Sequence, residues 1–551
     1  MGVSCYTPLF IFKKYLKIGG NILMKKLLLI LTLLMFALSC GNKNGSNGST
    51  FTLNIVTEPT SIDPQITTDV PGGTVDELIL EGLLRKDKTG KSVAGIAEKW
   101  EKSEDGLVWT FHLRDGVKWS NGDPVTANDF RAGWLRGLNP DTAAGNASML
   151  FVIKNGENYN SKKVSENEVG IKVIDDKTLQ VTLEAPTPYF DDLVTFKSFM
   201  PLNQKYYAEV KDKYFTEAEF TISNGPYTLE SWTHDSELKF KKNPNYWDAK
   251  NVNTDNVVLK IIATDSAVNA FKNKEVDVTA VTFEQAKEFA GKKELVKADD
   301  GGIYYLLFNT GENVFKNAKV RRALTMAINR EELINKVLEG SEKITKAFTP
   351  SGIGLNGLEK DFASEVTTDQ PKFNAEEAKK LLAEGLREEG LSELPRFEIL
   401  FNDTGSRKAI AEYIQENLRN NLGANVELDV VTGKERIERT KKRDYQIALM
   451  NWTGDFLDPI TYLDLFESKN ANNRGDFKNA RYDELTKIVK GSADPKVRVP
   501  AMLEMEKLIS EEQPVTILFQ KQKLYLVNPK VKNLGFVSIG GEFFIRDVVM
   551  N

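Results

Sequence analysis

The residues best suited to ligand chemistry in this sequence follow two apolar runs in its C-terminal half. Asp455 lies three positions after Trp452, just past the run YQIALM, and Arg407 lies just past the run RFEILF. A carboxylate and a guanidinium at separate points of one crevice would bind the two ends of a zwitterion, such as a short peptide. Extended peptide spans roughly 3.3 Å per residue, so their separation would select peptide length. The alternative is that Asp455 caps a turn, that Arg407 is a solvated helix residue and that Trp452 only packs.

The elements around these residues predict that both charged side chains face the same crevice. The runs at 396–401, 424–431 and 445–450 predict strands, and the charged stretch between the last two predicts a helix. A longer helix follows the first run and ends at Gly423, with an apolar stripe formed by Ile410, Ile414, Leu418 and Leu422. Alternating strands and helices with short connections predict parallel strands. Ligands bind at the carboxyl edge of such a sheet, which is where both charged residues lie.

Patterns in the N-terminal half predict further strands and hairpins. FTLNIV alternates as a strand, and VGIKVIDDKTLQVTL predicts a hairpin. LVWTFHLRDGVKW predicts a second hairpin, which turns at Asp115-Gly116. Thr126 is expected to cap a helix that runs through DFRAGWLRGL.

Length and composition place the chain among multidomain globular proteins. Its 551 residues exceed one compact core and predict two or three domains. The contents of 41% hydrophobic and 27% charged residues are typical of soluble proteins. The net charge of −5 argues against nucleic acid as the main partner.

The N-terminus predicts an export signal that is separate from the fold. Two lysines after Met24 precede an apolar run from Leu27 to Leu38, which is too short to span a bilayer as a helix. The four residues that end at Cys40, ALSC, resemble the bacterial lipobox, with alanine where leucine is preferred. Cleavage before Cys40 and lipidation of its thiol are therefore expected, and two or more acyl chains would anchor the protein stably.

Three segments are therefore assigned ahead of the fold. Residues 1–23 are expected to be an artefact of the assigned start, with translation beginning at the methionine that follows, and residues 24–39 are the expected signal peptide. Residues 40–50 are the expected lipidated cysteine and a flexible tether rich in Gly, Ser and Asn. Cleavage removes five lysines and no acid, so the formal charge changes from −5 to −10. It also removes Cys5, which leaves a single cysteine and excludes an intrachain disulfide.

The patterns of catalytic and metal sites fail in this sequence. GKS at 90–92 imitates the end of a phosphate loop, but Arg85 stands where that loop needs a glycine, and there is no G-x-S-x-G motif. His112 and His234 are the only histidines, His112 lies in a predicted strand, and metal-ligand spacing is absent. We expect no enzyme activity, no metal and no cofactor.

A set of motifs from about residue 51 to the C-terminus carries a family resemblance. The motifs are SIDPQ, EGLL, GIAEKWEKSEDGLVWTFHLRDGVKWSNGDPVTANDF, EAPTPYF, SNGPY, NPNYWD, VRRALTMAINREEL and WTGDFLDP. With them the chain resembles family 5 of the bacterial extracellular solute-binding proteins, the oligopeptide- and dipeptide-binding components of ABC peptide importers. Their order and spacing are specific to the family as a set.

The resemblance implies an α/β, two-lobed periplasmic-binding-protein fold of three domains, with mixed and parallel sheets and a hinge that closes over ligand. Lobe 1 is expected from 51–80, 203–301 and 518–551, with a second domain at 81–202 packed on it. Lobe 2 is expected from 302–517, which includes the predicted parallel strands.

The resemblance also implies a binding site. Peptide main chain is bound in β-strand fashion, and the family's acid for the peptide amino group falls on Asp455. Neighbouring contacts are expected from Asn451, Trp452, Thr453 and Gly454. Contacts from lobe 1 are expected from Thr68, Val70 and Asn146.

The chain departs from the family pattern at the positions that bind the carboxyl end of the peptide. Leu449 replaces a basic residue that some members use for the peptide carboxylate, and another position of that role falls on Arg407. Leu307 replaces an acid near the pocket of some members. These departures leave peptide length and sequence preference open.

The implied function is capture of short peptides and their delivery for import. The implied partners are short peptides, an ABC permease with its ATPase subunits, and the membrane through the lipid anchor, with the protein itself expected as a monomer. It would be exported and face the periplasm or the cell exterior. The alternatives are a binder of the same fold for a nickel chelate, haem, a cell-wall peptide or an oligosaccharide, or an anchored adhesin or chaperone.

Overall fold

The computed structural model describes residues 48–551, with gaps at 89, 313, 355–360 and 540–542. The predicted upstream extension, signal peptide, Cys40 and most of the tether lie outside the described residues. Residues Thr50–Asn551 group into one unit. Among the helices of the described ranges, none has the length and apolar content needed to cross a membrane.

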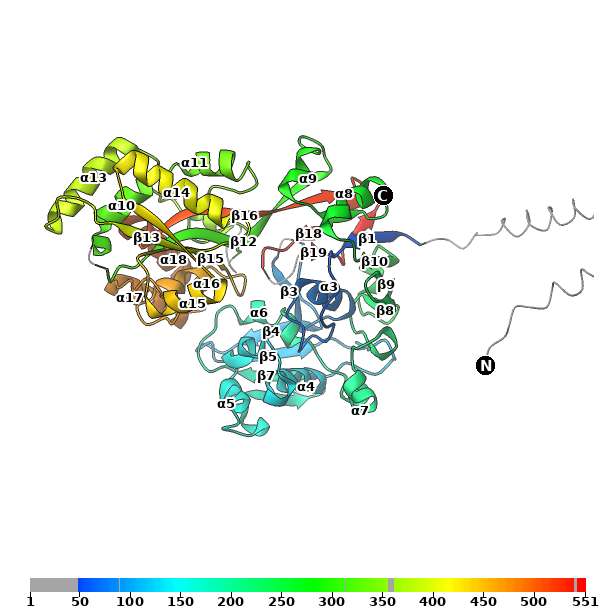
Figure 1. Cartoon of the computed structure of the whole chain (residues 1–551). Helices are drawn as coiled ribbons and strands as arrows, with labels where there is room; N and C mark the ends of the chain where they lie inside the picture. Colours follow the sequence, from blue (N-terminus) through cyan, green and yellow to red (C-terminus); the bar gives the residue numbers. More distant parts are fainter. Residues whose placement is uncertain (1–47, 89, 313, 355–360, 540–542) are drawn as a thin grey trace, which may run out of the picture. The chain divides into compact units, whose positions relative to one another are not determined.

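A mixed sheet of ten strands runs through the unit (Figure 1). Parallel and antiparallel pairs both occur in it, and helices cover its faces. In spatial order its strands are β14 (Val426–Val431), β13 (Phe397–Asn402), β15 (Ile447–Thr453), β12 (Leu295–Phe308), β16 (Val515–Val527), β11 (Val278–Ala280), β1 (Thr50–Asn54), β10 (Asn256–Lys260), β9 (Glu237–Lys242) and β8 (Tyr227–Thr233).

Two long antiparallel strands, β12 and β16, connect the two halves of this sheet. Figure 1 shows the red β16 beside the green β12 along this path. Their pairing holds on both sides of an irregularity between Asp299 and Ile303, where Gly301 and Gly302 lie. The two halves of the sheet are therefore joined by continuous strands with two local shifts in register, one between Asp299 and Ile303 and one between Tyr304 and Tyr305.

Buried apolar residues form three clusters that divide between the two halves. One cluster draws its members from 51–298 and 525–548, and the other two draw theirs from 303–519. The α/β two-lobed fold class is thereby confirmed, and the first set is called lobe 1 and the second lobe 2 below. The domain boundaries given above stay a prediction.

Lobe 2 contains the predicted series of parallel strands and helices. β13 pairs in parallel with β14 and with β15, as the short connections predict. Helix α14 (Arg407–Leu422) ends at Gly423, whose φ of 67° is the left-handed conformation that glycine adopts freely, and α15 (Gly433–Lys442) follows β14. β15 continues to Thr453, so Trp452 lies in the strand and Asp455 just beyond it.

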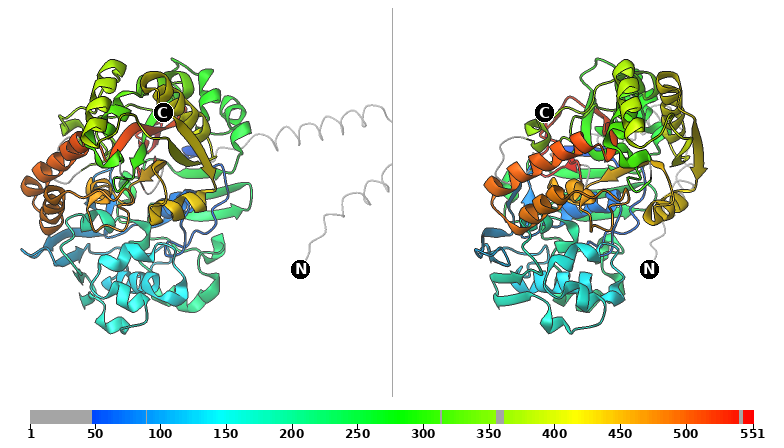
Figure 2. Two further views of the ribbon diagram at one scale, coloured as in Figure 1. Left: turned by 60° about the vertical axis from the view of Figure 1, so that its left-hand side comes forward. Right: turned by 90° about the vertical axis from the view of Figure 1, so that its left-hand side faces the viewer.

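A second, four-stranded antiparallel sheet lies within the predicted second domain. Its order is β4 (Ala97–Lys102), β5 (Val108–Leu113), β7 (Thr178–Thr182), β6 (Ile171–Asp175). The β6–β7 hairpin is confirmed, but the hairpin around Asp115-Gly116 is wrong, because β5 pairs with β4 and β7 instead. Figure 2 shows these cyan elements gathered on one side of the large sheet in both views.

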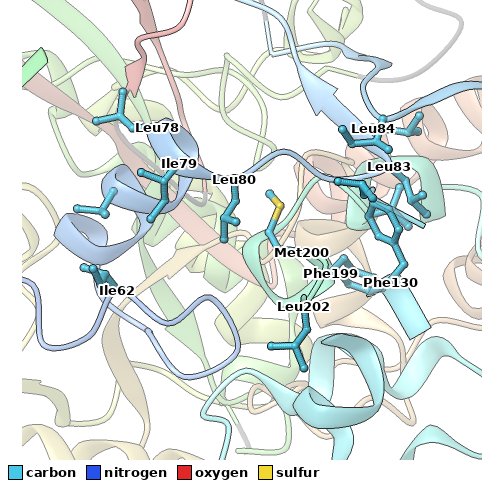
Figure 3. Close-up of a cluster of buried hydrophobic side chains, with 14 of the residues drawn as sticks. Ile62, Leu78, Ile79, Leu80, Leu83, Leu84, Phe130, Phe199, Met200 and Leu202 are labelled. Carbon is cyan, nitrogen blue, oxygen red and sulfur yellow. The ribbon is translucent and has the colours of Figure 1, made fainter. Parts of the chain in front are cut away.

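The core of lobe 1 joins helix α3 (Val70–Ile79) to this second sheet. Figure 3 shows Leu78 and Ile79 of α3 in one cluster with Phe130, Phe199 and Met200. Phe130 lies on helix α4 (Ala127–Leu138), whose first turn is closed by a hydrogen bond from the Thr126 backbone N–H to the Asp129 carboxylate, at 2.8 Å. The remaining helices of six or more residues are η2 (Ala147–Val152), α7 (Gln204–Val210), α8 (Thr264–Lys272), α10 (Ala318–Met326), α13 (Ala375–Glu388), α17 (Ala480–Gly491) and α18 (Pro495–Glu512).

Candidate functional site

A small cavity of about 70 Å³ lies between the lobes. Lobe 1 contributes Asp76 and Glu77 of α3, and lobe 2 contributes the loop of Asp455 and Phe456 that follows β15. Lys197 also lines it, and its ammonium donates a hydrogen bond to the Asp69 main-chain oxygen at 3.1 Å. The cavity is therefore a place where a bound molecule would touch both lobes.

The carboxylate of Asp455 has no partner within the described part of the chain. Among the described residues, none donates a hydrogen bond to it or forms an ion pair with it, although the residue as a whole is exposed. Burial of the carboxyl group raises the pKa of Asp455 above its usual value. An unpaired carboxylate that is partly removed from water favours a cationic ligand group.

The loop that carries Asp455 is held by hydrogen bonds to Thr461. The Asp455 backbone N–H donates to Thr461 Oγ1 at 3.0 Å, and the Trp452 indole N–H donates to the Thr461 main-chain oxygen at 3.0 Å. These bonds use the main chain and the indole, so the Asp455 carboxylate is positioned without being neutralised.

A buried ion pair holds the same loop from behind. Arg498 of α18 donates two hydrogen bonds to the Asp458 carboxylate, at 2.7 and 2.9 Å, and both side chains are 4% exposed. Asp458 also accepts a hydrogen bond from the Ile460 backbone N–H at 3.0 Å. Two parallel hydrogen bonds between a guanidinium and a carboxylate fix orientation as well as distance.

Gly454 allows the loop to pass close to the core. Its N–H donates to the Tyr462 hydroxyl at 3.0 Å, and that hydroxyl donates to the Gly301 main-chain oxygen at 2.7 Å. A Cβ at Gly454 would lie 2.7 Å from side-chain atoms of Ile539, Thr461 and Tyr462. The predicted contact from Gly454 to ligand would therefore come from a residue whose N–H is already bonded within the protein.

The strand that leads into this loop has a free edge. β15 pairs with β12 as far as Thr453, but within the described residues β13 reaches only Ile447 and Ala448 on its other side. The Leu449 main-chain oxygen on that side accepts a hydrogen bond from Arg407 at 3.2 Å. In a strand, the main-chain groups of every second residue point to the same side. Those of Asn451 and Thr453 therefore point to the same side as the Leu449 oxygen, where no described strand pairs with them.

A larger cavity of about 250 Å³ lies within lobe 2. Asn451 and Trp452 of β15 line it, together with Tyr305 of β12. Arg436 and Arg474 supply its charged groups. It is of the size that receives a side chain or a small molecular group.

Arg407 lies behind the strand and lines neither of these two cavities. It is 6% exposed, its guanidinium lies 5.1 Å from the Tyr304 ring centre, and it donates hydrogen bonds to Leu449 O and to the Asn451 side-chain oxygen. The structure thus does not bring Arg407 and Asp455 to one cavity, and a direct contact between Arg407 and ligand stays a prediction.

The residues predicted from lobe 1 lie together at the start of α3. Asn146 donates a hydrogen bond to the Thr67 main-chain oxygen at 3.3 Å, and Thr68 Cγ2 lies against Gly145. Val70 is the first residue of α3 and is 40% exposed. Thr68, Val70 and Asn146 do not line the cavity between the lobes.

Several residues of the two cavities were missed by sequence reasoning. Asp76 and Glu77 belong to no recognised motif, and the sequence of α3 predicts only an apolar helix that contains two acidic residues. Arg436 sits in GKERIERTKK, where its neighbours predict a solvated face. The signal that separates Arg436 from its neighbours is its burial, which depends on distant packing.

The two histidines lie outside both cavities. His112 contacts Glu101 at 3.1 Å, and His234 contacts Glu58 at 2.8 Å and Glu217 at 3.3 Å. The described part of the chain contains no group of three or more His, Cys, Asp or Glu side chains that could hold a metal ion.

Residues 91–474 match the family model of bacterial extracellular solute-binding proteins, family 5 Middle, which is most of the chain. The chain belongs to this family. It is 34% identical over 483 residues to the dipeptide-binding protein DppE of Bacillus subtilis (strain 168), a match that covers 88% of each protein.

Two solved structures of family 5 proteins compare differently with this one. An unliganded open form of the periplasmic murein tripeptide-binding protein MppA matches with a TM-score of 0.83 at 25% identity, over 92% of this chain and 98% of that one. Listeria monocytogenes OppA bound to peptide matches with a TM-score of 0.66 at 30% identity, over 92% and 100%. The less similar sequence therefore superposes better, and the fold described here is closer in overall geometry to the unliganded open form of MppA than to the peptide-bound OppA.

Proposed function

We propose that this family 5 protein captures short peptides between its lobes and delivers them to the permease of an ABC importer. The peptide's amino group binds Asp455, and the protein acts as a monomer anchored to the membrane through lipid on Cys40. Import then draws its energy from ATPase subunits on partner chains.

One observation carries this proposal, the unpaired carboxylate of Asp455 on a loop that is held from behind. The loop is fixed by the hydrogen bonds of Thr461 and by the Arg498–Asp458 ion pair, so little ordering remains when ligand binds. A peptide ammonium would make charge-assisted hydrogen bonds to Asp455, which are roughly twice as strong as neutral ones.

The free edge of β15 supports an extended peptide as the ligand. Asn451 and Thr453 offer main-chain donors and acceptors, whose hydrogen bonds to a peptide main chain do not depend on the peptide's side chains. A peptide added as a further strand gains affinity from these groups and sequence tolerance at the same time. Contact with both lobes then favours the closed arrangement, because the ligand binds it more tightly than the open one.

The test is calorimetry of purified protein, freed of co-purifying ligands, with short peptides that differ only in their N-terminus. A tripeptide with a free amino group should bind, and Asp455→Asn should weaken it by about 10- to 100-fold, the effect of losing a hydrogen bond to a charged group. The N-acetylated peptide should bind weakly to both proteins. The peptide should be recovered intact, since binding involves no chemistry.

Asp403→Asn is the matched control, because Asp403 is exposed just after β13 as Asp455 is just after β15. It should leave affinity unchanged. Equal loss of free and acetylated peptide in Asp455→Asn would contradict the assignment of the amino group. Native mass spectrometry that finds haem, a nickel chelate or a sugar on the protein would favour the alternative solutes.

A further inference from the structure

The larger cavity in lobe 2 is lined by charges of one sign. Arg436 and Arg474 lie in its wall with Asn451, Asn472 and Asn473, and none of its described lining residues is an aspartate or a glutamate. Asn451 and Trp452 of β15 line the cavity, so a peptide bound along the free edge of that strand would lie close to it. Its polar groups are thus suited to an anion.

Arg436 is buried, and no carboxylate of the residues that the structure describes pairs with it. The residue is 7% exposed, its Nη1 lies 2.7 Å from Met450 Sδ, and its Nε has no hydrogen-bond acceptor. Burial, with a further contribution from neighbouring Arg407, lowers the pKa of Arg436 to about 10. A buried cation without a counter-ion costs free energy that an incoming anion would offset.

Two other arginines near Arg436 in lobe 2, Arg439 and Arg443, are paired with carboxylates. Arg439, three positions along the same helix, lies 2.5 Å from Asp429, and Arg443 lies 2.7 Å from Asp476. Arg474 donates to the Thr440 hydroxyl at 3.4 Å, and no ion pair joins it to any described residue.

Arg407 adds a third cation at the back of this cavity. It bonds to the Asn451 side-chain oxygen, and Asn451 lines the cavity. Among described residues it too forms no ion pair with a carboxylate. Three guanidinium groups with no acid among them produce a positive local potential, because like charges in a poorly hydrated site are little screened.

The rest of the wall is apolar. Leu465, Phe466, Phe477 and Ile437 line it. An apolar stem that ends in a small anion would satisfy both parts of the wall, as the side chain of glutamate does.

We propose that this cavity binds a carboxylate of the bound peptide, from an acidic side chain or from the peptide's own C-terminus. The inference rests on the proposed peptide function and names the class of peptide that the site prefers. Met450, which contacts Arg436, is five residues from Asp455, so their Cα atoms are at most about 18 Å apart. The carboxylate therefore belongs to one of the first few residues of a peptide whose amino group is at Asp455.

The test compares four peptides by calorimetry on the unmodified protein. Ala-Ala-Ala and its C-terminal amide report on the C-terminus, and Ala-Glu-Ala-amide and Ala-Gln-Ala-amide report on an acidic side chain. We expect the acid of at least one pair to bind about 10- to 100-fold more tightly than its neutral counterpart. The pair that shows the difference identifies the source of the carboxylate.

Two variants assign that difference to the cavity. Arg436→Met should abolish it, whereas Arg439→Met, on the same helix but paired with Asp429, should leave it intact. Equal affinity for acid and neutral peptides in the unmodified protein, or an unchanged difference in Arg436→Met, would overturn the proposal and leave peptide binding standing.

A separate probe distinguishes failure of the peptide function from failure of the cavity. Glutarate alone should quench the fluorescence of Trp452, which lines the cavity, and the response should disappear in Trp452→Phe and in Arg436→Met. If no peptide binds but this response is present, the result supports the anion site and contradicts the proposed peptide function. If neither peptide nor glutarate acts on the protein, both are overturned.

Discussion

The rings of Tyr189 and Phe456 stack on each other across the two lobes, with centroids 4.1 Å apart and planes 8° apart. Tyr189 precedes helix α6 (Phe190–Leu193) in lobe 1, and Phe456 is next to Asp455 in lobe 2. The residue that follows the proposed ligand-binding acid therefore also connects the lobes.

Phe456→Ala should loosen the angle between the lobes of the unliganded protein. The lost stack is worth about 0.5–1.5 kcal/mol beyond its buried area. Residues 48–551 contain no cysteine, so one introduced cysteine in each lobe can carry a spin label without background. The distance distribution should broaden in Phe456→Ala and stay narrow in Phe456→Tyr, which keeps the ring. An unchanged distribution in Phe456→Ala would show that the stack does not restrain the angle between the lobes.

Arg498→Met should destabilise lobe 2 and weaken peptide binding together. Removal of one partner leaves Asp458 as a buried, unpaired charge, which costs about 3–5 kcal/mol, and it releases the loop that carries Asp455. Urea unfolding followed by tyrosine and tryptophan fluorescence measures the first effect, and calorimetry measures the second. The double variant Arg498→Met/Asp458→Leu should recover much of the stability but not the affinity, because the apolar pair does not orient the loop. Full affinity in either variant would count against the role of the ion pair in positioning.

Gly454→Ala should reduce both stability and affinity. The added methyl would lie 2.7 Å from three side chains, and such overpacking costs about 1–3 kcal/mol. Gly491→Ala is the control, because a Cβ there meets nothing within 4 Å. Thermal unfolding and peptide titration of the two variants measure the contrast, and equal behaviour would mean that the loop accommodates the methyl.

Glu77→Gln should flatten the dependence of stability on pH. Burial raises the pKa of Glu77 from 4.5 to about 8, against an opposing effect of Lys197. Between these two pH values the folded protein holds a proton that the unfolded chain releases, so the free energy of unfolding decreases as pH rises through this window. Denaturant titrations at pH 5 and pH 8 should show a smaller loss in Glu77→Gln than in the unmodified protein. Glu104→Gln, at an exposed carboxylate, should match the unmodified protein, and an unchanged loss in Glu77→Gln would contradict the buried proton.

Local patterns predicted lobe 2 well because its order is local. β13, α14, β14, α15 and β15 follow each other in the chain, and each has a clear apolar period and a short connection. The hairpin at Asp115-Gly116 failed because the partners of β5 lie at 97–102 and 178–182, and the turn signal carries no information about such distant pairing.

The candidate site was predicted in the same uneven way. Asp455 was predicted because the end of a parallel strand and the family motif agree on it; it lines the cavity between the lobes, and its contact with ligand stays a prediction. Arg407 was placed at the right edge of the sheet, but its orientation depends on Leu449 and Asn451, which take up its donors. Arg436 was missed because it contacts Met450 of β15, which is distant from the local pattern, and its own helix is polar apart from Ile437.

The irregularity in β12 and β16 has a mechanical consequence. The strands stay paired on both sides of the segment from Asp299 to Tyr305, so a tilt of the lobes at this segment would leave the hydrogen bonds within each lobe intact. The segment of shifted register would thus act as a hinge between two stably paired parts of β12 and β16. On the proposed function, ligand binding would change the angle between the lobes, and the permease would recognise that angle at the outer faces of the protein without contacting the ligand.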